Sequence, residues 1–204
     1  MNTSDLLRYG TATLAEAWPA TRLINAPLRP LAPGMALAGP ALTVRCLPGD
    51  NLALHLAIAA ATPADVLVVD YGGSLDSGPF GEIMALACQM RGITGIIIDG
   101  AVRDSAQIAA LGFAAFARGL NIRGTVKHDR GQIGGSVTIG GVTIAAGDIV
   151  LADADAVVTL EREDLPAALA ASEARTARET QMMQRLRQGE TTLDILGLRQ
   201  ESDR

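Results

Sequence analysis

The sequence predicts an α/β fold with a largely parallel sheet and a long helix near the C-terminus. Apolar runs typical of buried strands alternate with helical segments between residues 41 and 111, and this order builds βαβ units. With 204 residues, of which 49% are hydrophobic, the chain can bury a substantial core. We therefore expect a single domain over 1–204, with its core at about 14–160 and a helical extension at about 163–204.

The elements of this domain follow from local sequence signals. Residues 3–18 suit one or two short helices, and the Pro-rich segment 21–35 suits a connecting loop because it lacks an apolar period. Strands are expected at 41–46, 66–70 and 95–99, and helices at about 51–61, 81–91 and 105–111. The strand at 66–70 is continuously apolar and ends in a carboxylate, which is typical of a buried strand that opens into a loop.

After Phe113 the pattern changes to short strands. Gly140 and Gly141 separate β-branched segments at 136–139 and 142–144, and this arrangement predicts a β-hairpin. The segments that follow are two short strands at 149–152 and 157–160, a long helix from 163 to about 188, and a tail at 191–204 that is expected to dock on a neighbour or to fray.

Composition excludes several classes of function. The net charge of -5 provides no basic field for phosphate backbones, so we expect no nucleic-acid partner. Aromatic residues form only 3% of the chain, which leaves no platform for stacking bases or sugars. There is no signal-peptide pattern and no apolar run long enough to span a bilayer, so we expect a soluble, cytoplasmic protein without a membrane partner. Cys46 and Cys88 lie in apolar settings without metal-ligand spacing, which fits a reducing compartment and predicts that both are small core residues.

A glycine-rich loop leads into the helix predicted at 81–91. Residues 72–81 contain four glycines and one proline, so the backbone can approach a ligand closely. The N–H groups of Glu82, Ile83 and Met84 would then point at an anion, and the helix dipole would add to the attraction. The alternative is an ordinary solvent-exposed turn.

Arg103 favours the binding interpretation. It follows the strand at 95–99 through a short turn, so we expect it at the carboxyl edge of the sheet, where open α/β folds bind ligands. Its planar guanidinium can hold a carboxylate through two parallel hydrogen bonds. Asp104 can ligate a hard cation such as Mg²⁺ through one oxygen. Alternatively, Arg103 and Asp104 are a helix-terminal charge and its solvated neighbour.

Glu82 precedes Arg103 by 21 positions. The helix dipole favours a glutamate in the first turn, so by itself Glu82 indicates a good helix start. Beside a metal held by Asp104, it could position a water or accept a proton. The remaining candidates are expected to have structural roles. Asp70 and Asp99 are expected to cap loops, although one of them could contact a residue that binds the ligand. We expect His55 to be a partly buried packing residue, His128 to lie on the surface, and Asp153 and Asp155 to form a turn between strands.

These motifs resemble a known family. The similar segments are 81–85, 91–104, 124–127 and 147–153, and they look like the family of 4-hydroxy-4-methyl-2-oxoglutarate aldolases and RraA-like proteins. The resemblance runs from about Leu14 to Glu179. Its most specific part is an acidic residue, 20 intervening positions and then Arg-Asp, which Glu82, Arg103 and Asp104 match. Members that lack the first acidic residue form the ribonuclease-regulator branch, so this chain resembles the aldolase branch.

The resemblance implies a swivelling β/β/α-type fold and a homotrimer or dimer of trimers with sites between subunits. It implies that the backbone of Gly81, Glu82, Ile83 and Met84, together with Arg103, holds the carboxylate and 2-oxo group of a pyruvyl substrate. Asp104 would be the direct ligand of a divalent metal cation, Mg²⁺ or Mn²⁺. A further catalytic glutamate would come from the neighbouring subunit and matches Glu179. One departure is Ala156, which stands where the family usually has glycine.

The implied function is that of a class II, metal-dependent pyruvate aldolase, a carbon–carbon lyase. Its substrates would be 4-hydroxy-2-oxo acids such as 4-hydroxy-4-methyl-2-oxoglutarate, which are cleaved to pyruvate and an oxo acid, with oxaloacetate decarboxylase side activity. Glu82, Arg103 and Glu179 would be its catalytic residues. Two alternatives are a non-catalytic RraA-like regulator that binds a ribonuclease or helicase, and a metabolite-binding domain.

Overall fold

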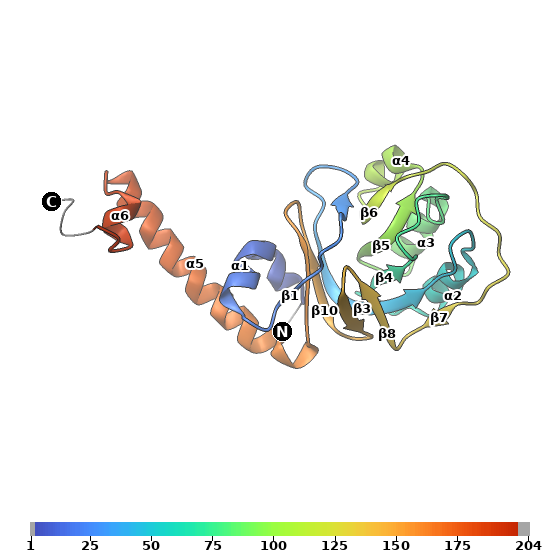
Figure 1. Ribbon diagram of the computed structural model, residues 1–204, viewed down its shortest axis with the longest axis horizontal. Helices are drawn as coiled ribbons and strands as arrows, with labels where there is room; N and C mark the ends of the chain where they lie inside the picture. The colour runs from blue at the N-terminus through green and yellow to red at the C-terminus, as the bar shows by residue number, and fades with distance from the viewer. Residues whose placement is uncertain (1–2, 200–204) are drawn as a thin grey trace.

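The computed structural model describes residues 3–199 and shows an α/β body from which a long helix projects (Figure 1). Within these residues, nine strands form one sheet in the order β1-β11-β10-β3-β4-β5-β6-β2, with β7 paired to β3. The strands of this sheet are β1 (Arg22–Leu23), β2 (Arg29–Pro30), β3 (Leu37–Arg45), β4 (Val66–Asp70), β5 (Gly95–Val102), β6 (Ala114–Leu120), β7 (Gln132–Ile133), β10 (Ile149–Ala152) and β11 (Val157–Leu160). A separate hairpin pairs β8 (Ser136–Ile139) with β9 (Val142–Ala145).

The central strands β3, β4, β5 and β6 run parallel, and a helix joins each to the next. These helices are α2 (Leu52–Ala60), α3 (Glu82–Met90) and α4 (Ser105–Ala110). Because the four strands are parallel, their carboxyl ends meet at one edge of the sheet. The loops that follow β4 and β5 therefore lie side by side at this edge.

Apolar packing covers both faces of the sheet. On one face Leu54, Cys88 and Ile108 of the three helices pack in a cluster that includes Ile98 of β5. On the other face the hairpin buries Val137, Ile139 and Ile144 in a cluster with strand residues such as Ile97. Strands that are buried on both faces are mostly apolar, which explains the continuous apolar runs at 66–69 in β4 and 96–98 in β5.

Helix α5 (Leu165–Arg187) follows the 3₁₀ turn η2 (Arg162–Asp164) and packs on the body only through its first part. Leu165 and Ala168 lie in a third apolar cluster with Leu6 of the 3₁₀ helix η1 (Thr3–Arg8) and Leu14 of α1 (Gly10–Ala17). The rest of α5 leads away from the sheet toward α6 (Thr192–Ile195) (Figure 1). No helix among the described residues has both the length and the apolar character needed to cross a membrane.

Most predicted elements are confirmed, and the differences concern short or alanine-rich strands. The expected positions of β4, β10, β11, the hairpin and α5 hold. Strand β6 was not predicted, because Ala and Gly are depleted in strands and give no clear alternation. The segment predicted as a loop at 21–35 contains β1 and β2. The sheet is mixed, not largely parallel, since the outer strands pair antiparallel. The end of the predicted tail, 200–204, lies outside the described residues.

Candidate functional site

The start of α3 and the end of β5 meet at the carboxyl edge of the sheet, as the sequence predicts. The backbone N–H of Arg103 donates to the carbonyl oxygen of Phe80 at 2.9 Å. Oδ2 of Asp104 accepts the backbone N–H of Glu82 at 3.1 Å and lies 3.7 Å from Nε of Arg103. The helix start, the guanidinium and the Asp104 carboxylate are thus brought together by direct contacts.

The predicted anion-binding N–H groups are only partly free. The N–H of Met84 donates to the carbonyl oxygen of Gly81 at 3.1 Å, and the N–H of Glu82 binds Asp104. Within residues 3–199, the N–H of Ile83 has no hydrogen-bond acceptor. The first turn of α3 therefore offers one free backbone N–H rather than three. The carbonyl oxygen of Gly81 and the Asp104 carboxylate accept the other two N–H groups.

Asp104 has a left-handed backbone conformation, with φ of 55° and ψ of 39°. This region is unfavourable for residues with a side chain, although Asp tolerates it better than most. The conformation turns the chain sharply between β5 and α4 and directs the carboxylate toward Glu82. Backbone strain of this kind clusters at functional sites.

Gly81 leaves the space that Asp104 and Arg103 occupy. A Cβ atom at Gly81 would clash with Oδ2 of Asp104 and would lie 3.0 Å from Cγ and Nε of Arg103. Its φ of -149° is ordinary extended backbone, so the requirement for glycine here is steric. The glycine-rich loop thus serves the site by close approach of backbone to side chains.

The assembled residues lie at an open surface. The side chains of Arg103 and Asp104 are 42% and 40% exposed, and Ile83 is 81% exposed. Two cavities of about 390 and 500 Å³ lie beside Leu47 and Pro48, and neither is lined by Arg103 or Asp104. A small substrate at Arg103 would therefore remain in contact with solvent unless another chain covered it.

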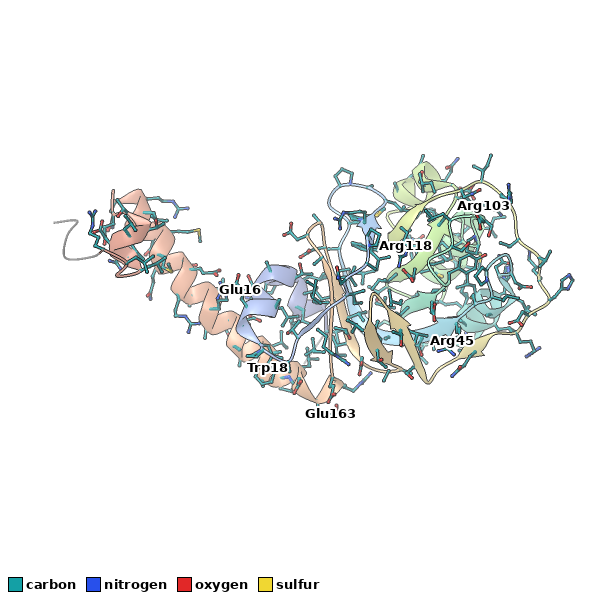
Figure 2. All side chains as sticks on the ribbon, in the orientation of Figure 1. Glu16, Trp18, Arg45, Arg103, Arg118 and Glu163 are labelled. Carbon is teal, nitrogen blue, oxygen red and sulfur yellow. The ribbon has the colours of Figure 1, made fainter. Side chains whose placement is uncertain are left out.

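Glu179 is not brought to these residues within one chain. It lies on α5 and pairs with Arg175, with 2.8 Å between Oε1 of Glu179 and Nε of Arg175. Arg175 also pairs with Glu16 of α1. In Figure 2 Glu16 and Arg103 lie toward opposite ends of the α/β body. A role for Glu179 at the site would require a second copy of the chain.

Asp104 suits a divalent cation. Its Oδ1 takes no hydrogen bond from the described residues, while Oδ2 is held by Glu82. Mg²⁺ is commonly held by one or two carboxylates and keeps waters and substrate oxygens as further ligands. The part of the chain that the structure describes contains no group of three or more His, Cys, Asp or Glu side chains that could form an all-protein metal cage. The donor set therefore fits Mg²⁺ or Mn²⁺ held mainly by Asp104.

The other candidate residues have structural partners. Asp70 accepts the N–H of Gly72 at 3.0 Å, which confirms a loop-capping role. Asp99 is buried and pairs with Arg118 of β6, a partner that the sequence did not reveal because β6 was not predicted. Asp153 accepts hydrogen bonds from the backbone and hydroxyl of Thr11. His128 is exposed as predicted, and His55 is exposed rather than partly buried.

Both cysteines belong to the core. They are buried and unpaired within the described chain, and burial raises the pKa of Cys46 and Cys88 to about 12. A thiol with such a pKa is protonated at neutral pH and is a poor nucleophile or metal ligand. The prediction of small core residues is confirmed.

Asp50 anchors the long loop after β6 next to the site. Its carboxylate accepts the N–H groups of Leu52 at 2.8 Å, His128 at 2.7 Å and Asp129 at 3.0 Å. Burial alone would raise the pKa of Asp50, but these backbone hydrogen bonds outweigh it and hold the pKa below its usual value. The ionised side chain thus binds two segments together.

We expect Asp50→Asn to lower the free energy of unfolding at pH 7 by about 1–3 kcal/mol, because a buried, charge-assisted hydrogen-bond network is lost. The folded-state pKa lies below the unfolded value of about 3.9, so this stabilisation is present above about pH 4 and is lost as the pH falls through the folded pKa. Urea unfolding of both proteins from pH 3 to pH 7 measures it. A difference that stays constant over this range would contradict the prediction.

Comparison with known proteins identifies the family. The RraA-like model, described as Aldolase/RraA, matches residues 11–159. A protein of Halalkalibacterium halodurans named "Putative 4-hydroxy-4-methyl-2-oxoglutarate aldolase" is 34% identical over 152 residues, which cover 74% of this chain and 72% of that protein.

Solved structures share the fold of this chain. A Geobacillus kaustophilus structure titled S-adenosylmethionine: 2-dimethylmenaquinone methyltransferase superposes with a TM-score of 0.72 at 31% identity and covers 76% of this chain and 96% of its own. The RNA-processing inhibitor RraA from Thermus thermophilus gives 0.68 at 24% identity over 79% and 93% of the two chains. The names differ while the fold is shared, so activity has to be argued from the site. The chain belongs to the RraA-like (Aldolase/RraA) family.

Proposed function

We propose that this protein is a divalent-metal-dependent aldolase that releases pyruvate from 4-hydroxy-2-oxo acids such as 4-hydroxy-4-methyl-2-oxoglutarate. The observation that carries the proposal is the contact of Asp104 with both the Glu82 backbone and the Arg103 guanidinium at the start of α3. The name of the 34% identical relative supports the same chemistry. Oxaloacetate decarboxylation is proposed as a side activity, because it also develops negative charge on a pyruvyl group.

Each residue of the site would have its own role in the reaction. Arg103 binds the substrate carboxylate and compensates its charge, and the free N–H of Ile83 donates to the same anion. A Mg²⁺ or Mn²⁺ ion held by Asp104 would supply Lewis-acid stabilisation of the charge that develops on the 2-oxo oxygen. Glu82 positions a water or hydroxide that removes the C4 hydroxyl proton as the C3–C4 bond breaks, and a proton is then returned to C3.

The proposal is tested by assaying pyruvate release from purified protein with Mg²⁺, with and without a chelator. We expect turnover of 4-hydroxy-4-methyl-2-oxoglutarate and slower turnover of oxaloacetate, both abolished by the chelator and restored by Mg²⁺. Absence of metal-dependent pyruvate release from every 4-hydroxy-2-oxo acid tried and from oxaloacetate would reject the aldolase. A ribonuclease or helicase captured by a catalytically inactive protein would then favour the regulator alternative.

We further propose a homotrimer, or a dimer of trimers, in which Glu179 of one copy completes the site of another. An exposed apolar stripe on α3 supports this proposal, because Ile83, Leu86 and Met90 are 81%, 46% and 76% exposed. Leu186 in the far part of α5, Leu193 in α6 and Leu196 directly after α6 are also exposed. Both surfaces are suited to burial between copies. The buried free cysteines support a cytoplasmic location.

Leu186→Asp is expected to lower both the molar mass measured by light scattering and the rate of pyruvate release, because a charge opposes burial of this apolar surface. Gln184→Asp adds the same charge two residues away, where no exposed leucine is lost, and should leave mass and rate unchanged. An unchanged mass in the Leu186 variant would show that this part of α5 is not an interface.

A further inference from the structure

Asn51 lies beneath the loop that leads into α3 and touches both sides of the segment 79–84. It is the residue before α2 and is only 6% exposed. Its Nδ2 donates to the carbonyl oxygen of Pro79 at 2.8 Å and lies 3.7 Å from Sδ of Met84. One buried side chain therefore contacts the chain just before Gly81 and the end of the first turn of α3.

The Asn51 side chain does not cap α2, although its position before the helix suggests that role. Asparagine before a helix usually caps it by accepting a backbone N–H, but Asn51 makes no such bond. Asp50 accepts the N–H of Leu52 instead, at 2.8 Å. The backbone N–H of Asn51 donates to the carbonyl oxygen of Val126 at 3.1 Å, which fixes its position. The amide is thus free to reach Pro79.

Asn51 also retains a polar atom at a cost in stability. Its Oδ1 is buried and has no hydrogen-bond partner among the described residues. An unpaired buried acceptor destabilises the folded state, because it loses its hydrogen bonds to water without replacement. Exchanging Oδ1 and Nδ2 would place two oxygens against each other at Pro79, so the amide orientation is determined by its partner. A destabilising feature beside the candidate site is explained if the amide serves the geometry of that site.

We propose that Asn51 is a positioning residue for the anion-binding start of α3, an inference that rests on the proposed function. Three successive hydrogen bonds hold the preceding loop: Gly78 N–H to Arg123 O at 2.9 Å, Asn51 Nδ2 to Pro79 O, and Arg103 N–H to Phe80 O at 2.9 Å. The first and third are backbone bonds, so Asn51 provides the one link of the three that a side-chain substitution can remove. Losing it shifts the N–H of Ile83 relative to Arg103.

The test compares Asn51→Leu with wild type and with Gln89→Leu. Gln89 is a matched control, because its Nε2 donates to the carbonyl oxygen of Leu111 at 2.7 Å near the other end of α3. We measure hydrogen–deuterium exchange of the segment 78–86, and pyruvate binding in the presence of Mg²⁺ by calorimetry. Asn51→Leu should exchange faster over this segment and bind pyruvate at least about 10-fold more weakly, a loss of about 1.4 kcal/mol. Gln89→Leu should leave pyruvate affinity unchanged.

Wild-type affinity in Asn51→Leu would overturn the proposal, whether or not exchange becomes faster, because Asn51 would then be merely structural. Equal loss of affinity in Gln89→Leu would overturn it as well. If the wild-type protein itself binds no pyruvate, the proposed function fails, and unchanged exchange in the Asn51 variant would separately reject the positioning of this segment. Should Asn51→Leu fail to fold, Asn51→Asp is measured in the same way, since it keeps the shape and places a carboxylate oxygen against Pro79.

Discussion

Asp104→Asn is expected to lower kcat/KM for metal-dependent pyruvate release by at least about 10²-fold. Asparagine keeps the shape of the side chain and an oxygen that can accept the N–H of Glu82, but it lacks the charge that holds Mg²⁺. Lewis-acid stabilisation is worth several kcal/mol, and each 1.36 kcal/mol corresponds to about tenfold in rate. The rate is measured by coupling pyruvate release to its reduction, at increasing Mg²⁺ concentrations.

Two controls separate loss of the metal from loss of the fold. Asp155→Asn removes another exposed carboxylate, in a turn between strands β10 and β11, and should leave kcat/KM unchanged. The thermal midpoint of Asp104→Asn should stay close to that of wild type, because the contact with the start of α3 is retained. Wild-type turnover in Asp104→Asn would remove Asp104 from the metal site and with it the main support for the mechanism.

Gly81→Ala is expected to lower kcat/KM by about 10²-fold while the protein remains folded. The added methyl group would clash with Oδ2 of Asp104 and crowd Cγ and Nε of Arg103, so both side chains must move. Misplacement of catalytic groups by about 1 Å can cost about 10²-fold in rate. The backbone of Gly81 is extended, so alanine introduces no strain in φ.

Gly124→Ala is the matched control, because Gly124 also lies beside Arg103 but has room. The nearest atom to a Cβ atom at Gly124 would be Nη1 of Arg103 at 4.0 Å, an ordinary contact distance. We expect wild-type kcat/KM for this variant. If Gly81→Ala and Gly124→Ala both behave as wild type, close approach at Gly81 is not needed for turnover. If both lose activity equally, the effect does not come from the space that Gly81 leaves.

Much of the fold could be predicted from local patterns. The apolar run of β4, the two-glycine hairpin and the Ala-, Glu- and Arg-rich helix α5 each carry a signal within their own segment. Their predicted positions therefore hold. Strand β6 lacks such a signal, because it forms by pairing with β5 and β2 rather than by its own propensity. The two-residue strands β1, β2 and β7 are too short to show any period. Long-range pairing decided these elements.

The sequence by itself determined the chemistry available to the site. The spacing of Glu82, Arg103 and Asp104, the glycine-rich loop and the ends of two buried strands were enough to place these groups at one edge of the sheet. Their mutual arrangement was decided by the tertiary structure. The Asp104 carboxylate accepts the hydrogen bond from the Glu82 N–H, and this leaves the N–H of Ile83 as the available donor.

Only the tertiary structure showed which buried side chains hold the backbone of the site in place. The sequence suggests Asp50 or Asn51 as the cap of α2, yet Asn51 binds Pro79, which lies 28 positions away along the chain. Likewise Asp99 meets Arg118 only because β5 and β6 are neighbours. Strand ends are placed by short-range periodicity, whereas the partners of buried polar groups depend on contacts between distant segments that no local pattern encodes.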